Sequence, residues 1–228
     1  MDFDLALRLT EILLAIAFIQ QSLEHLQAAK NERILFIQRF VLSGFLLSGF
    51  FTNWICLLLF INALLILKRF RGPYNGGSDK MSLLILTSLC LIHFIPMGQR
   101  YIFAYLAIQV VLSYFMPGLF KLINKSWWNG SVLKDIFEFS SFPAADNIRA
   151  YAQKPKLLLF ATWLMLLFEL LFPFALLSKA TLILAIIFAM GFHLINHYFF
   201  GFNRFLWFWL AAYPSLFWFQ KYFFSSFL

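Results

Sequence analysis

The sequence predicts an all-α integral membrane protein: a bundle of about eight transmembrane helices with one amphipathic segment at the membrane surface. Of the 228 residues, 62% are apolar and only 12% are charged, whereas soluble domains are about 45–50% apolar and about 25% charged. So few charged side chains cannot cover a water-soluble surface, and the 32 Phe residues would leave large apolar patches exposed. The apolar runs are also too long and too continuous for the alternating strands of a membrane barrel.

Eight apolar segments approach the roughly 20 residues that a membrane-spanning helix needs. They are separated by clusters of Gly, Pro, Asn and charged residues. In chain order they are Leu5–Gln27, Arg33–Ser48, Thr52–Leu67, Met81–Met97, Arg100–Leu122, Lys156–Ser178, Ala180–Phe199 and Phe202–Phe223. Because residues 34–67 could instead form one long tilted or broken helix, we expect seven to nine spans. Without a visible repeat, we expect a single transmembrane domain over residues 1–228.

In the first half of the chain, polar or acidic residues mark the ends of the segments. The first segment follows Asp2 and Asp4, where a signal peptide would carry Lys or Arg, so it is expected to be a permanent span. Gly49 separates the second segment from the third. The polar connection at residues 68–80 (KRFRGPYNGGSDK) separates the third segment from the fourth, which ends at Met97, just after Pro96.

In the second half, the fifth segment ends just after Pro117–Gly118, and a long connection at residues 123–155 follows. Within this connection, Val132, Ile136 and Phe139 recur at i, i+4 and i+7 near the two tryptophans of residues 127–128. This apolar strip predicts an amphipathic helix that lies in the headgroup plane. The last three segments complete the bundle.

The net charge of +8 predicts membrane topology rather than nucleic-acid binding, because the basic residues are scattered at segment ends and form no stripe. If the spans alternate, the loops on one side hold all of the 18 Lys and Arg residues except Arg8, Arg100, Lys179 and Lys221. The positive-inside bias places that side, which includes Arg39 and Arg204, in the cytoplasm. The chain is expected to lie in a bacterial inner membrane.

Polar side chains inside spans are costly, so each is a candidate for a site. Glu169 stands in the middle of the sixth segment and should be neutral or paired. His193 and His197 share a helix face with Asn196 beside them, which favours a polar cavity; a packing role for each histidine, or a metal site with two ligands at most, is the alternative. Lys121 ends the fifth span, and its stem could simply reach the interface.

The first span also has a polar face near its end, where Gln20, Gln21, Glu24, His25 and Gln27 lie on neighbouring strips of one helix. This face either lines a polar site or has already reached the headgroups. Cys56 and Cys90 lie in apolar runs and are expected to be small core residues.

Three motifs, in the same order, resemble those of the vitamin K-dependent gamma-glutamyl carboxylases and their bacterial relatives with a horizontally transferred transmembrane domain. The first is Tyr114–Leu122 (YFMPGLFKL) with Trp127 or Trp128 and Asn129–Gly130, similar to the family's Gly-x-x-Lys-Leu turn followed by Trp and Gly. The second is Tyr74–Asp79, at the place of a Trp-Asn-Asn-His-Ser loop. The third is Phe192–Asn196 followed by Phe205, which resembles a Phe-His-x-x-Asn helix.

The resemblance implies that Lys121 is the base that deprotonates a reduced quinone of the vitamin K type, with His193 as a second catalytic residue. It also implies a cofactor site from Asn75, Ser78, Trp127, Glu169, Asn196 and His197. The loop at residues 74–79 lacks the family's histidine, and the sequence ends soon after its last span. We therefore do not expect carboxylation of protein glutamate. The family topology places the lysine outside, which conflicts with the charge bias.

Three functions follow as alternatives. The first is a carboxylase-like membrane enzyme that acts with a quinone-type lipid and modifies a small secreted peptide. The second is a non-catalytic membrane subunit that holds a peptide or a partner protein during maturation or export. The third is electron transfer through haem, for which His25, His93, His193 and His197 are the only suppliers of histidine ligands.

Overall fold

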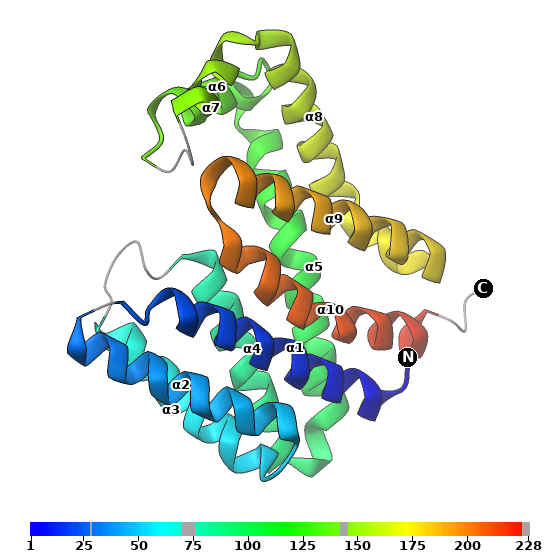
Figure 1. Ribbon diagram of the computed structural model, residues 1–228. Helices are drawn as coiled ribbons and strands as arrows, with labels where there is room; N and C mark the ends of the chain where they lie inside the picture. The colour runs from blue at the N-terminus through cyan, green and yellow to red at the C-terminus, as the bar shows by residue number, and fades with distance from the viewer. Residues whose placement is uncertain (28, 70–75, 142–145, 225–228) are drawn as a thin grey trace. The chain divides into compact units, whose positions relative to one another are not determined.

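The computed structural model describes residues 1–27, 29–69, 76–141 and 146–224, and every regular element within these ranges is helical (Figure 1). The chain divides into two compact units. The first contains Met1–Ile108 and Arg204–Tyr222, and the second contains Gln109–Asn203 and the residues from Phe223 onward. The helical prediction is therefore confirmed for the described part of the chain.

The first unit is built from helices that neighbour one another along the sequence. These are α1 (Phe3–Glu24), α2 (Lys30–Ser48), α3 (Thr52–Arg69), α4 (Gly77–Phe94), the 3-10 turn η1 (Pro96–Gly98), the first part of α5 (Gln99–Ile123) and α10 (Asn203–Phe223). Helix α1 packs on α2, α2 on α3 and α3 on α4, as the blue to cyan ribbons of Figure 1 show. The chain turns between α2 and α3 at Gly49, whose φ is 80°. Residues 34–67 are thus two helices packed on each other, and the single long helix is wrong.

The second unit contains the remainder of α5, η2 (Lys125–Trp127), α6 (Ser131–Phe139), α7 (Asp146–Arg149), η3 (Ala150–Gln153), α8 (Pro155–Leu171), η4 (Phe172–Leu177) and α9 (Lys179–Phe200). Helix α9 starts at a capping box between Ser178 and Thr181, which satisfies N–H groups that a helix leaves unpaired. Helix α6 packs on η3 and α8, and η4 packs on α9.

The amphipathic segment forms a helix, α6, but its packing face differs from the strip seen in the sequence. Phe137 is buried against Tyr151, Phe199 and Phe200, and Leu133 joins this cluster. Phe139, one of the predicted strip residues, is 73% exposed. Two apolar faces therefore exist on α6, and the one that packs inside the unit is one residue away from the strip that the spacing suggested.

Four helical stretches of the described chain are long and apolar enough to cross a membrane: Thr52–Arg69, Pro96–Ile123, Pro155–Leu177 and Lys179–Phe200. The protein is an integral, multi-pass membrane protein. The other predicted spans coincide with α1, α2, α4 and α10, which carry more polar and charged residues in their sequences. For these four helices, spanning remains a prediction, and so does the total of eight.

Candidate functional site

An ion pair between Lys121 and Glu169 joins α5 to α8 in the second unit. The Lys121 Nζ donates to both carboxylate oxygens of Glu169, at 2.6 and 2.7 Å. The side chains are 14% and 5% exposed, respectively. Bidentate, charge-assisted bonds of this kind are among the strongest hydrogen bonds in proteins. The mid-span carboxylate is therefore paired, and the lysine does more than extend its stem to the interface.

Gly118 allows this pair to form, because it brings the backbones of α5 and α8 together. A Cβ atom at position 118 would lie 2.8 Å from the Glu169 Cβ and 3.0 Å from the Leu170 backbone nitrogen. Lys121 follows Gly118 by three residues, so both lie on the same face of α5. Pro117 precedes Gly118 inside the helix and cannot donate the usual backbone hydrogen bond. The family-like turn thus positions the lysine against α8.

The tryptophans after α5 fold back over the lysine end of the helix. The Trp127 ring centroid lies 5.4 Å from the Lys121 Nζ, within reach of a cation–π interaction. Phe120, by contrast, is 67% exposed. Gly130 precedes α6 as its N-cap with φ 77°, and a Cβ atom there would lie 3.0 Å from the Leu159 backbone nitrogen. Only glycine fits this position without strain.

A second polar contact joins the two family-like helices α5 and α9. The Tyr114 hydroxyl and the His193 Nε2 lie 2.8 Å apart, and both side chains are buried. The Tyr114 ring stacks on Phe172, with centroids 4.1 Å apart. Tyr114 precedes Lys121 by seven residues, so the two polar groups of α5 share one helix face. Tyr114 opens the first motif, but the sequence alone indicates no role for it.

An apolar cavity of about 310 Å³ lies between α6, α8 and α9. Its walls are mostly aromatic and aliphatic, and Asn196 contributes an amide. Met165, another wall residue, precedes Glu169 by one helical turn, and Phe192 is adjacent to His193. The wall thus includes sequence neighbours of Glu169 and His193, while the four residues of the two polar contacts are not themselves among the residues that line the cavity. His197 is exposed, so the two histidines of α9 lie in different environments.

The remaining predicted site residues lie elsewhere. Ser78 is buried near the start of α4, in the first unit. Asn75 lies outside the described residues. Lys121 takes its polar contacts among the described residues from Glu169, and His193 is bonded to Tyr114 instead. The structure thus brings together Lys121, Glu169 and Trp127, and separately Tyr114 and His193.

Sequence reasoning missed a second polar cluster, which lies in the first unit around Arg39. The charge tally treated Arg39 as a loop residue, but it lies inside α2 and is only 3% exposed. It donates to Gln21 and Asn62. The polar face at the end of α1 was the available signal, since Gln21 and His25 both line this cluster. The reading of that face as a headgroup boundary does not account for the burial of Gln21.

Three of the four histidines, His25, His93 and His193, are engaged in hydrogen bonds. His93 Nε2 lies 2.7 Å from Glu11 Oε1, and Glu11 also accepts from Arg8. His25 contacts Glu32 and Arg204. Within the described ranges, no group of three or more His, Cys, Asp or Glu residues is arranged to hold a metal ion.

Comparison with known families agrees with the motifs of the second unit. The family model of the HTTM domain, the transmembrane domain associated with vitamin K-dependent carboxylases, matches residues 95–221. This range is more than half of the chain and includes Lys121, Glu169 and His193, whereas the motif at Tyr74–Asp79 precedes it. No curated protein and no solved structure matches the chain significantly. The resemblance seen in the sequence is confirmed, and the chain belongs to the HTTM domain family.

Proposed function

We propose that the protein is a carboxylase-like membrane enzyme in which Lys121 acts as a base toward a reduced quinone-type lipid and Glu169 is the proton partner of that lysine. The observation that supports this proposal is the bidentate Lys121–Glu169 pair at the family-like turn. We place the enzyme in a bacterial inner membrane and propose a small secreted peptide as its substrate. These assignments go beyond the family relationship itself.

A lysine in a tight ion pair carries a proton and cannot accept another, so it needs a neighbour that takes this proton. Glu169 lies at hydrogen-bonding distance through both oxygens, which makes it the natural acceptor. Exclusion of water by a bound ligand disfavours both charges and therefore favours transfer of the proton from Nζ to the carboxylate. The neutral amine then has a free electron pair for a proton from the cofactor. Trp127 covers the amine and limits its contact with water.

The residues present fit a quinone-type cofactor. When bound, such a cofactor supplies a weakly acidic hydroxyl and reacts with oxygen once that proton is removed. A flat, mostly apolar ring suits the aromatic cavity between α6, α8 and α9, because ligand pockets are typically apolar with a few placed polar groups. Asn196 offers both a donor and an acceptor for a ring oxygen. His193, oriented by Tyr114, lies one turn before it on α9.

A non-catalytic subunit is the second candidate function. The observation that favours it is that Lys121 and Glu169 satisfy one another, as a purely structural ion pair would. In this case the apolar cavity holds a segment of a peptide or of a partner membrane protein, and no proton moves.

The deciding experiment compares quinol-dependent oxygen consumption by the purified full-length protein and by three variants in lipid nanodiscs. A reduced menaquinone analogue is the probe. Lys121→Ala should lose nearly all turnover, since removal of a general base typically costs about 10²–10⁴-fold in rate. Glu169→Gln should also lose turnover, because its amide cannot accept the lysine proton. Lys125→Ala is the matched control, as this lysine is exposed in the next turn and should have wild-type activity.

Turnover by Lys121→Ala at the wild-type rate would show that Lys121 is not the base and would contradict the enzymatic proposal. Binding of the quinol analogue with no oxygen consumption by any form would favour the non-catalytic subunit. The unfolding temperature of each variant, measured in the same nanodiscs, separates a lost base from a lost fold.

A further inference from the structure

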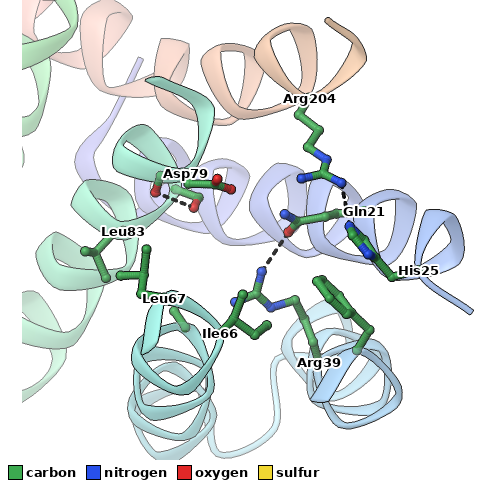
Figure 2. A pocket seen from close by; sticks show the side chains of 11 residues that line it. Gln21, His25, Arg39, Ile66, Leu67, Asp79, Leu83 and Arg204 are labelled. Carbon is green, nitrogen blue, oxygen red and sulfur yellow. Dashed lines mark hydrogen bonds between the residues drawn. The ribbon is translucent and has the colours of Figure 1, made fainter. Parts of the chain in front are cut away.

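The first unit contains a small polar pocket that is separate from the proposed quinone site. It is enclosed by α1, α2, α3, α4 and the start of α10. Figure 2 shows Gln21, His25, Arg39, Asp79 and Arg204 around it. Apart from Arg204, its wall residues precede the segment matched by the family model. Asp79 also ends the second family-like motif, so the pocket lies mostly, but not wholly, outside the family-like segments.

Arg39 is a buried cation that the described chain does not pair with an acid. Its Nη1 donates to the Gln21 Oε1 at 2.7 Å, its Nε donates to the Asn62 Oδ1 at 3.0 Å, and its guanidinium lies 4.5 Å from the Phe18 ring centroid. These partners are neutral. Among the described residues, no carboxylate oxygen lies within 4 Å of a nitrogen of Arg39. The nearest opposing charge on the pocket wall is Asp79, which Gln21 links to Arg39 without a direct ion pair. A buried charge without a direct ion pair is costly, so a ligand that supplies a negative charge beside Arg39 would relieve this cost.

Arg204 places a second guanidinium on the pocket wall. Its Nε donates to the Glu24 Oε2 at 3.1 Å, and its Nη2 lies 2.5 Å from the His25 Nε2. Because arginine only donates, the His25 Nε2 must accept, and the Nδ1 donates to the Glu32 Oε1 at 2.8 Å. His25 is therefore the neutral tautomer with its proton on Nδ1. This chain of bonds holds Arg204 at the pocket without adding a charge from the histidine.

Asp79 is the opposing charge on the wall. No Lys, Arg or His nitrogen of the described residues lies within 4 Å of its carboxylate. Burial raises the pKa of Asp79, while the charges of Arg204 and Arg39 and a hydrogen bond from Gln21 act in the opposite direction. An anion in the pocket would gain mainly from Arg39, since Arg204 is already paired with Glu24, and it would be repelled by an ionised Asp79. The aspartate therefore limits the affinity for an anion. Removal of its charge should tighten anion binding, whereas removal of the Arg39 charge should weaken it.

The size and walls of the pocket narrow the ligand to one compact group on an apolar body. Its volume of about 20 Å³ corresponds to one or two water-sized atoms, which suits the two oxygens of a carboxylate. A planar carboxylate also matches the fork of a guanidinium. Ile66 and Leu67 of α3 form part of the wall, directly before Lys68 and Arg69, where a candidate span ends. This is the level at which amphiphiles place their polar heads.

We infer that the pocket beside Arg39 binds a single carboxylate group, carried by a fatty acid or by a small soluble acid. Arg39 and Arg204 attract the carboxylate, Asp79 weakens its binding, and the α3 wall accepts the first carbons behind it. This site is independent of Lys121 and of the proposed chemistry.

The test is a titration of the full-length protein in nanodiscs of neutral lipid, read out as the shift in unfolding temperature. Oleate, sodium acetate and sodium phosphate are the three probes. Oleate should raise the unfolding temperature in a saturable way, and Arg39→Gln should weaken its binding at least about tenfold, because bonds to charged groups are the strong ones. Asp79→Asn should tighten binding. Arg100→Gln, which removes an exposed arginine outside the pocket, should bind as the wild type does.

The three probes also distinguish a fatty acid from a small soluble acid as the source of the carboxylate. Saturable binding of oleate alone indicates a fatty acid, and binding of acetate as well indicates that a small soluble acid suffices. Equal oleate affinity in the wild type and Arg39→Gln, or no gain in Asp79→Asn, would overturn the inference. Binding of phosphate without either carboxylate would also overturn it. Because Arg39→Gln removes two internal hydrogen bonds, Asp79→Asn keeps the test decisive if the arginine variant does not fold.

Discussion

The hydroxyl of Tyr114 lies 2.8 Å from Nε2 of His193, so the first and third family-like motifs touch through their buried polar groups. The tyrosine comes from α5 and the histidine from α9, which are distant in sequence. The ring of Tyr114 also stacks on Phe172 at the start of η4. This contact fixes the α5 face that carries Lys121 two turns later.

The first prediction concerns this contact. Tyr114→Phe keeps the ring stacking but removes the hydroxyl, which leaves a buried nitrogen of His193 without this bond. Leaving a buried polar group unsatisfied costs about 1–3 kcal/mol, so the unfolding temperature should fall. Tyr105→Phe is the control, because Tyr105 lies on the same helix but is exposed, and its unfolding temperature should stay unchanged. Equal stability of both variants would mean that the hydrogen bond contributes nothing.

The second prediction concerns the ion pair between Lys121 and Glu169. Lys121→Met should destabilise the protein by about 3–5 kcal/mol, because it leaves the buried carboxylate without its counter-ion. This differs from the small effect expected for a lysine whose stem only reaches the interface. The double variant Lys121→Met/Glu169→Leu should recover most of the loss, since it removes both charges. Chemical unfolding in detergent gives the three free energies, and additive losses in the double variant would contradict the pairing.

The third prediction concerns the close approach at Gly118. Gly118→Ala places a methyl group 2.8 Å from the Glu169 Cβ, which is closer than packed carbon atoms allow, so α5 and α8 must separate. Overpacking of this kind costs about 1–3 kcal/mol. Gly44→Ala is the matched control, because nothing lies within 4 Å of the added atom and alanine favours a helix by about 1 kcal/mol. The first variant should unfold at a lower temperature than the wild type, and the second at an equal or higher one.

The fourth prediction is a dependence of stability on pH that comes from Asp79. Burial raises its pKa in the folded protein, so the folded state binds the proton more tightly than the unfolded chain does. The stability contributed by Asp79 is therefore lost as pH rises from the unfolded value near 3.8 through the raised pKa. Asp79→Asn cannot titrate and should gain stability relative to the wild type as pH rises. Unfolding temperatures at pH 4.5 and 7.5 measure this, and a constant difference between the two proteins would count against the raised pKa.

The helices were predictable because lipid imposes a long apolar run and each run ends at a visible break. The predicted ends of α3, α5 and α9 lie within two residues of those in the structure. In the structure α2 ends just before Gly49, although the sequences of α2 and α3 together form one nearly continuous apolar stretch. The apolar pattern could not decide which helices cross the membrane. Helices α1 and α2 bury polar side chains inside the protein, and these residues lower the mean hydropathy of the helix even though they do not face lipid.

The partners of the polar residues were less predictable than the residues themselves. Glu169 and Lys121 were both identifiable, one from its depth in an apolar run and the other from the motif, but nothing local indicates that they pair. Tyr114 was hidden because a tyrosine in an aromatic helix is ordinary. Arg39 was misassigned to a loop although it lies inside the predicted segment Arg33–Ser48, because the sequence does not show whether a basic residue faces solvent or a buried amide.

The approach of α5 to α8 at Gly118 also affects how divergent relatives should be interpreted. The glycine is required by backbone contact, so a relative that has lost all chemistry would retain it for as long as it retains the fold. Lys121 and Glu169 are under a different constraint, since loss of either one leaves the charge of the other buried without its counter-ion. They should therefore disappear together along a lineage that abandons the reaction. The glycine in such an alignment would report ancestry, and the joint presence of lysine and glutamate would report the capacity for proton transfer.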